Sequence, residues 1–208
     1  MTHSLHRTGT EENLSNDFIV FAMSGKGVNE AGSGEKMREF YRITRKHNPI
    51  NMGDMKTGNW FIVPENKIVG NIQDTSIVHA VYKDMDTVSA VIKDLIEADL
   101  GLSIVISGLL APIKNECQKQ GLKPAPHTVE YSLGIFGKTT LLPTEGVLEV
   151  GTMCGHGQVA FGLIQEAVID IKAGKTTPEM AAKRLAEPCV CGIFNPERAK
   201  ELLQKMSG

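Results

Sequence analysis

Three of the four cysteines in this 208-residue chain stand in two short stretches of its C-terminal quarter. The stretch "GTMCGHGQV" (151–159) places Cys154 and His156 two residues apart, and "EPCVCGIF" (187–194) does the same for Cys189 and Cys191. Thiolate sulfur and imidazole nitrogen are the ligands that bind zinc and iron–sulfur clusters. Close cysteine pairs in a reducing compartment indicate metal or catalytic chemistry rather than disulfides. The spacing therefore predicts a metal centre.

The elements expected around these residues would bring them together. Cys154 and His156 precede an expected helix over 157–174, whose first backbone N–H groups would favour a thiolate or an anionic cluster. Cys189 and Cys191 fall between two further expected helices, over 176–187 and 195–206. A helical hairpin places both loops at one end. We expect Cys154, His156, Cys189 and Cys191 to be metal ligands.

The same residues resemble a known domain. "CGHGQVAFGLIQ" and "CVCGIFNPERAKELL", within residues 150–208, are similar to the helical [2Fe–2S]-binding domain of the xanthine dehydrogenase and carbon monoxide dehydrogenase small-subunit family. The resemblance implies that Cys154, Cys189 and Cys191 are cofactor-binding residues for an iron–sulfur cluster, and that the function is electron transfer with a redox partner protein. Gly157 stands where that family has its fourth cysteine. The family's companion ferredoxin domain has no counterpart, since residues 1–150 contain only Cys117.

Several interpretations stay open at this point. The fourth ligand could be His156, Cys117 or a group from a second subunit, or the position could be open to substrate. One alternative function is a zinc-binding protein with a structural Cys₃His site and a small-molecule-binding or catalytic α/β domain. Another is an enzyme with an open three-cysteine metal centre. Whether the chain is an enzyme is undecided, and an oxidoreductase or a component of one is the class these residues suggest. The remaining interpretations are that the cysteines are small buried residues at helix ends, or that they are reactive thiols.

The rest of the chain predicts a larger α/β part. Apolar, β-branched runs predict strands over 17–25, 59–70, 75–82, 101–109 and 127–137, and helical periodicity predicts helices over 35–47, 84–100 and 110–122. The strand–helix–strand unit over 75–109 implies a parallel crossover. We expect an α/β fold: residues 1–148 form a domain with a mixed or mostly parallel sheet and helices, and residues 149–208 form an all-helical bundle that binds the metal or cluster.

Two glycine-containing loops and two strand histidines are weaker candidates. The loop over 25–34 follows a strand and precedes a helix, but its glycines match neither dinucleotide-binding nor Walker spacing, so whether it binds anything is open. The stretch "GIFGKTT" (134–140) lacks the first glycine of the Walker pattern. His79 and His127 are each more consistent with ordinary strand residues than with ligands.

Composition excludes some classes of partner. A net charge of −2 argues against nucleic acid, which requires a basic excess. The longest apolar runs are too short to span a bilayer, and the N-terminal residues are polar, without the apolar core of a signal peptide. We therefore expect a cytoplasmic protein with its first dozen residues mobile or draped over the surface. A homo-oligomer is neither indicated nor excluded.

Overall fold

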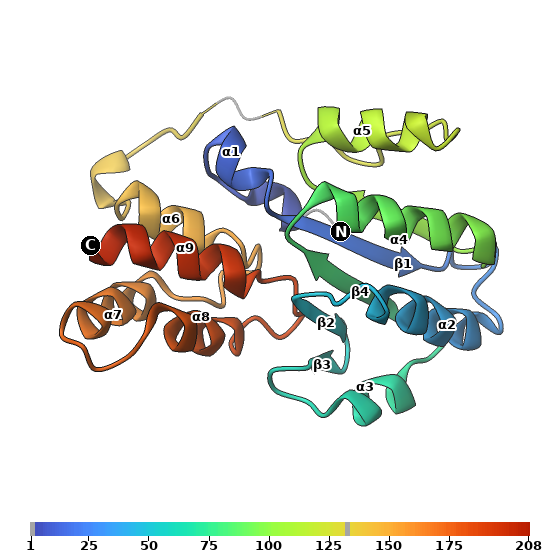
Figure 1. The fold of residues 1–208 in the computed structure, drawn as a ribbon, viewed down its shortest axis with the longest axis horizontal. Coiled ribbons are helices and arrows are strands. Elements are labelled where there is room, and N and C mark those ends of the chain that lie inside the picture. Colours follow the sequence, from blue (N-terminus) through green and yellow to red (C-terminus); the bar gives the residue numbers. More distant parts are fainter. Residues whose placement is uncertain (1–2, 132–133) are drawn as a thin grey trace.

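The computed structural model of the chain describes residues 3–131 and 134–208. The fold is α/β, with one sheet in the N-terminal part and helices alone in the C-terminal part (Figure 1). The strands are β1 (Phe18–Met23), β2 (Asn51–Asp54), β3 (Gly58–Asn59), β4 (Ile77–Tyr82) and β5 (Ser103–Ser107). The main helices are α2 (Ser33–Arg45), α3 (Glu65–Asn71), α4 (Met85–Ala98), α5 (Leu110–Lys119), α6 (Glu145–Gly151), α7 (Phe161–Lys172), α8 (Pro178–Ala186) and α9 (Pro196–Ser207).

The sheet is antiparallel, which corrects the expectation of a mixed or mostly parallel one. Its strand order is β3-β2-β4-β1-β5, and each pairing in it is antiparallel. Strands β4 and β5 run in the same direction, as the strand–helix–strand pattern predicts, but β1 lies between them and pairs with both. The unit is therefore a split β-α-β of the ferredoxin-like kind. The sequence of a crossover determines strand direction and does not reveal which strand is inserted.

The two faces of the sheet are covered by different helices. Phe18, Val20 and Ala22 of β1 belong to a core with α2 and α4, whereas Ile19 and Phe21 belong to a second core with the C-terminal helices. This alternation follows from the two-residue period of a strand. In Figure 1 helices α6 to α9 gather at the left of the molecule, and α2 and α4 lie at the right. The C-terminal helices thus share one core with the sheet, and the expected domain boundary after residue 148 falls inside α6.

Most expected helices are confirmed, and their ends follow known capping rules. Thr177 caps α8 by accepting a hydrogen bond from Met180 N at 3.2 Å, and Asn195 caps α9 by accepting one from Arg198 N at 3.0 Å. A proline follows each cap residue directly, where its missing N–H costs nothing. Helix α6 and strand β2 were not expected, because each is short and β2 ("NMGD") has no β-branched residue.

Two expected strands are absent or shorter. Of the predicted strand over 59–70, only Asn59 lies in a strand, as the last residue of β3, and Glu65–Asn71 forms α3. The predicted strand over 127–137 is irregular at 127–131 and 134–137, and its residues 132–133 lie outside the described residues. Strand β5 is at the sheet edge and is paired with β1 alone, so the described residues of 127–137 do not add a strand beside it. Alternation of apolar residues is not enough to form a strand, because a strand also needs a neighbour to pair with.

From His3 onward, the N-terminal residues are packed against the rest of the fold. Ser4 Oγ and Ser107 Oγ are 2.7 Å apart in a buried hydrogen bond, and the short helix α1 (Glu11–Leu14) leads into β1.

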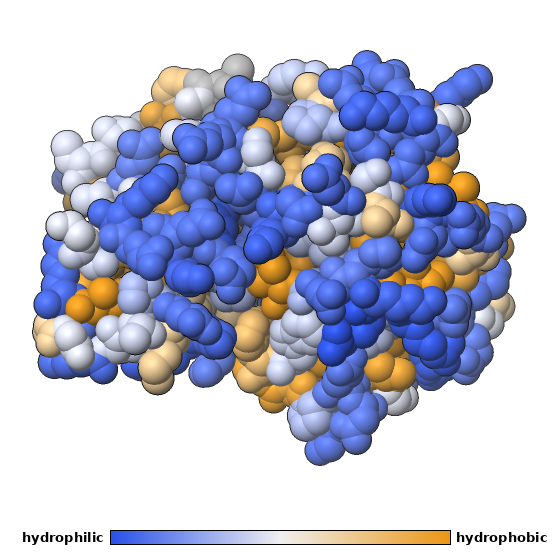
Figure 2. All heavy atoms as spheres, in the orientation of Figure 1, coloured by the Kyte–Doolittle hydropathy of each residue, from blue (hydrophilic) through white to orange (hydrophobic). Residues whose placement is uncertain are grey.

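Figure 2 shows a face on which hydrophilic residues predominate, with hydrophobic residues in smaller patches between them. Within the described parts of the chain, none of the helices is long and apolar enough to cross a membrane.

Candidate metal centre

Three of the predicted ligands meet in the interior. Cys189 and Cys191 lie in the connection between α8 and α9, as expected, and their sulfur atoms are 3.8 Å apart. Cys154 is within hydrogen-bonding reach of Cys189. The side chains are 0–4% exposed and belong to the core that joins the sheet to the C-terminal helices. All four cysteines of the chain are thiols rather than disulfides.

Cys154 does not open a helix, contrary to expectation. It lies in a turn between α6, which ends at Gly151, and α7, which begins at Phe161. Its backbone N–H bonds back to Gly151 O at 3.2 Å, and its carbonyl accepts from Gly157 N at 2.9 Å. The proposed stabilisation of a thiolate by a helix N-terminus therefore does not operate at Cys154. The turn still brings Cys154 to the loop of Cys189 and Cys191, as the hairpin argument required.

The three thiols lie within hydrogen-bonding reach in the order Cys154, Cys189, Cys191. The hydrogen bond between Cys154 and Cys189, together with burial, raises the pKa of Cys154 far above its usual range. The same bond by itself would lower the pKa of Cys189, but the bond with Cys191 and burial raise that pKa to about 11. The bond from Cys189 lowers the pKa of Cys191, with help from the Ile193 N–H group and the charge of Arg7. Cys191 is thus the thiol most ready to ionise.

The other predicted or suggested ligands lie elsewhere. His156 is exposed, two residues from the buried Cys154. Cys117 is buried in the core on the opposite face of the sheet, so it does not reach the thiols as a fourth ligand. Burial raises the pKa of Cys117, which disfavours its reactive thiolate form. His127 is exposed and its Nδ1 lies 2.9 Å from Thr128 Oγ1.

The sheet holds the loop of Cys189 and Cys191 in place through residues that the sequence did not single out for this role. Asn59 Nδ2 donates a hydrogen bond to Cys189 O at 2.9 Å. His79 of β4, fully buried on this face, lies against Gly192 so closely that a Cβ there would be 2.8 Å from His79 Nε2. Gly192 has φ +76°, which favours glycine. An asparagine at a strand end carries no sequence pattern that would reveal this contact.

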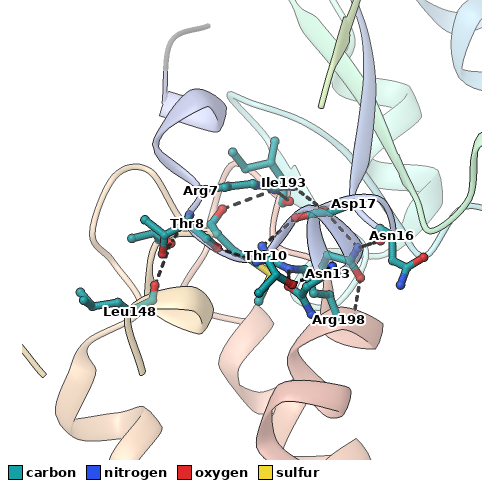
Figure 3. Close-up of polar contacts among 12 residues, drawn as sticks. Arg7, Thr8, Thr10, Asn13, Asn16, Asp17, Leu148, Ile193 and Arg198 are labelled. Atoms are coloured by element: carbon teal, nitrogen blue, oxygen red, sulfur yellow. Dashed lines mark hydrogen bonds and ion pairs between the residues drawn. The ribbon is translucent and has the colours of Figure 1, made fainter. Parts of the chain in front are cut away.

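A buried charge network ties the N-terminal segment to the same loop (Figure 3). Arg7 and Arg198 both pair with the carboxylate of Asp17, and Arg7 Nη2 donates to Ile193 O, two residues after Cys191. Arg198 Nη2 also donates to Thr8 O at 2.6 Å, and Asn195 Nδ2 donates to Asp17 Oδ1 at 3.1 Å. Burial lowers the pKa of Arg198, and the nearby Asp17 acts in the opposite direction.

Three cysteine sulfurs are donors that a thiophilic metal binds, and one of the distances between them is that of a metal site. Metal–sulfur bonds of about 2.3 Å at tetrahedral angles separate two ligand sulfurs by about 3.8 Å, the Cys189–Cys191 distance. Over residues 3–131 and 134–208, however, no group of three or more His, Cys, Asp and Glu side chains could hold a metal ion as placed. The thiols are neighbours, and one of them at least must turn to face a common centre.

The glycine-rich loop over 25–34 is occupied by the protein itself. The Asp74 carboxylate accepts hydrogen bonds from Gly32 N at 2.9 Å and from Gly34 N at 2.8 Å, at the start of α2. These bonds, first of all the one from Gly34, lower the pKa of Asp74. The backbone groups that would cradle a phosphate therefore already bind a carboxylate.

Comparisons with protein-family models, with curated proteins and with solved structures find no match to this chain.

Proposed function

We propose that the protein binds an iron–sulfur cluster through Cys154, Cys189 and Cys191, and that it transfers electrons to or from a partner protein in the cytoplasm. The observation that carries the proposal is the meeting of three buried thiols, from two loops 35 positions apart in sequence, in one hydrogen-bonded chain. When bound, such a cluster supplies one-electron transfer.

The surroundings of the thiols support this proposal. The core around them is apolar, and cluster potentials depend on burial and on hydrogen bonds to sulfur. Cys191 receives a backbone hydrogen bond from Ile193 and Cys189 receives one from Phe194. These N–H groups would stabilise the negative charge of sulfur ligands. The sheet contacts of Asn59 and Gly192 would hold the Cys189–Cys191 loop in one conformation.

A fourth ligand is required for a [2Fe–2S] cluster. Gly157 offers no side chain at the position that the resembled family fills with cysteine. His156, or a group from outside this chain, would supply the ligand. His156 is two residues from Cys154, in an exposed turn that contains two glycines, and glycine permits backbone conformations that other residues rarely adopt.

A structural zinc site is the second candidate, and a particular observation favours it. The 3.8 Å sulfur separation suits two ligands of one tetrahedral ion, and closed, buried sites are typical of structural zinc. The open three-cysteine enzyme centre has less support. Two cavities, of about 420 Å³ and 940 Å³, are lined by other residues than Cys154, Cys189 and Cys191.

The test is metal and sulfide analysis of anaerobically purified protein, with its visible absorption spectrum. The proposal expects about two irons and two sulfides per chain and a brown colour that dithionite bleaches. Cys154→Ser, Cys189→Ser and Cys191→Ser should each lose iron, whereas Cys117→Ser, a change at an equally buried thiol on the other face, should retain it. One zinc per chain and no visible absorption would replace the cluster with the structural site. Absence of any metal would refute both.

A further inference from the structure

A large cavity lined in part by Arg7 has no role in the metal centre, because Cys154, Cys189 and Cys191 are not among its lining residues. It has a volume of about 940 Å³ and runs along the edge strand β5, between the N-terminal segment, helices α4 and α5, and residues 122–130. This volume is in the range of small-molecule sites. Apolar side chains form most of its wall, among them Phe21, Ile92, Val105, Leu110 and Ile113.

One buried cation lines this apolar cavity with unused hydrogen-bonding capacity. The Arg7 side chain is 6% exposed, yet within the described residues its Nε atom has no hydrogen-bond partner. A buried guanidinium N–H without an acceptor is costly, and proteins rarely leave one unsatisfied. The place for a missing acceptor is therefore beside Arg7.

The carboxylate that pairs with Arg7 is shared and fully engaged. Asp17 pairs with Arg198 as well as with Arg7, and it also accepts a hydrogen bond from Asn195. The charge of Glu149 also acts on Arg198. Along the cavity wall, Arg7, Lys114 and Lys123 are positive whereas Asp17 and Glu130 are negative, so the lining has a net charge of +1 with His127 neutral. A ligand with one negative charge would bring the net charge of the lining to zero.

From these observations we infer that the cavity binds a monocarboxylate with an apolar body, such as a medium-chain fatty acid or an aryl-alkanoic acid. The carboxylate accepts a hydrogen bond from Arg7 Nε–H, and the apolar part lies on Phe21, Val105 and the α5 side chains. A guanidinium binds a carboxylate more strongly than a neutral group does, because the hydrogen bonds are charge-assisted. Cys154, Cys189 and Cys191 do not line this cavity, so binding here does not depend on the metal.

The direct test compares three ligands that each have eight carbons in a straight chain: octanoate, octan-1-ol and octylammonium. Each is titrated into the full-length wild-type protein by calorimetry, and the arginine Nε–H resonances are followed by NMR. We expect octanoate to bind at least about tenfold more tightly than either of the others, since one charge-assisted hydrogen bond contributes about that factor. The Arg7 Nε–H resonance should shift with octanoate and not with octan-1-ol.

Variants locate the site. Arg7→Lys keeps the charge beside Asp17 but removes the Nε donor, so octanoate should weaken about tenfold while octan-1-ol binding stays unchanged. Ser103 is exposed and lines the cavity, so Ser103→Trp should block all binding and Ser103→Ala should preserve it. Equal affinity for octanoate and octan-1-ol, or no binding of any of the three, overturns the proposal on wild-type protein alone. Binding that survives Ser103→Trp would place the ligand elsewhere and overturn it too.

Discussion

Asn59 at the end of the sheet donates a hydrogen bond of 2.9 Å to the carbonyl oxygen of Cys189. The same side chain accepts a hydrogen bond from Phe61 N at 2.9 Å, so both ends of its amide are engaged in a fully buried position. This contact joins residues 130 positions apart in sequence. The loop that carries two of the three clustered thiols is thereby packed against the sheet. Substitutions in the loop or in the sheet residues that contact it should therefore change the positions of the thiols.

Gly192→Ala should disrupt this contact. A Cβ at residue 192 would lie 2.5 Å from the Asn59 Cβ and 2.8 Å from His79 Nε2, in a backbone conformation with φ +76°. We expect a loss of about 2–5 kcal/mol in the free energy of unfolding, from left-handed strain and overlap together. Urea denaturation measures this loss.

Gly174→Ala is the matched control for that substitution. Gly174 has φ +68° and nothing within 4 Å of its would-be Cβ, so only strain of about 1–2 kcal/mol is expected. Equal losses for the two variants would show that the close approach to Asn59 and His79 has no energetic weight. Loss of metal in Gly192→Ala alone would tie the contact to the thiol centre as well.

Asp17→Asn should destabilise the fold strongly. Asp17 and Arg198 are both 0% exposed in their ion pair, and the substitution leaves two buried guanidiniums without a carboxylate partner. Removal of one partner from a buried pair costs about 3–5 kcal/mol. Thermal and urea unfolding should both show the loss. Glu179→Gln, which breaks the exposed pair with Lys183, should leave the midpoint unchanged within error, because exposed pairs contribute little. Similar effects of the two substitutions would contradict the role of the network.

Alkylation of the metal-free protein should follow the order of the thiol pKa values. The pKa of Cys191 is lowered by the hydrogen bond from Cys189, so Cys191 has more thiolate at neutral pH than an ordinary cysteine. Because thiolate is the reactive form, iodoacetamide should modify Cys191 first among the three, and Cys154, with its raised pKa, last. The protein is sampled at successive times of labelling and digested, and mass spectrometry of the peptides gives the order in which the cysteines are modified. In unfolded protein, the reference, the three cysteines should react at similar rates. Faster labelling of Cys154 than of Cys191 would contradict this order of pKa values.

Asp74→Asn should change how stability depends on pH. The pKa of Asp74 is lowered in the folded protein by the Gly34 and Gly32 N–H groups, so the ionised form stabilises the fold. That contribution is complete above the unfolded pKa of about 3.9 and is lost as pH falls through the lower folded value. The wild-type protein should therefore be more stable than the variant at pH 7, and the difference should shrink in strong acid. A difference that is the same at pH 7 and at pH 2.5 would assign the effect to shape rather than charge.

Several features were predictable because they depend on residues close together in sequence. The periodicity of "MDTVSAVIKDLIEA" determines helix α4, and Asn195 followed by Pro196 determines where α9 begins. The placement of Cys189 and Cys191 in a short connection between two helices follows from the same local rules. Their meeting with Cys154 was also predicted, since antiparallel helices bring alternate loops to one end. That these thiols bind a cluster stays a prediction.

Only the tertiary structure decided which groups surround those thiols. Strand β1 pairs antiparallel between β4 and β5, which are far from it in sequence. This arrangement depends on the burial of both faces of the sheet, and no local sequence pattern predicts it. It places His79 and Asn59 against the cysteine loop and leaves Cys117 on the other face. Likewise Arg7, in a polar N-terminal stretch without periodicity, is buried because Asp17 lies within reach after folding. Local sequence thus determined the helices and the cysteine spacing, whereas packing across the sheet decided what the cysteines and Arg7 face.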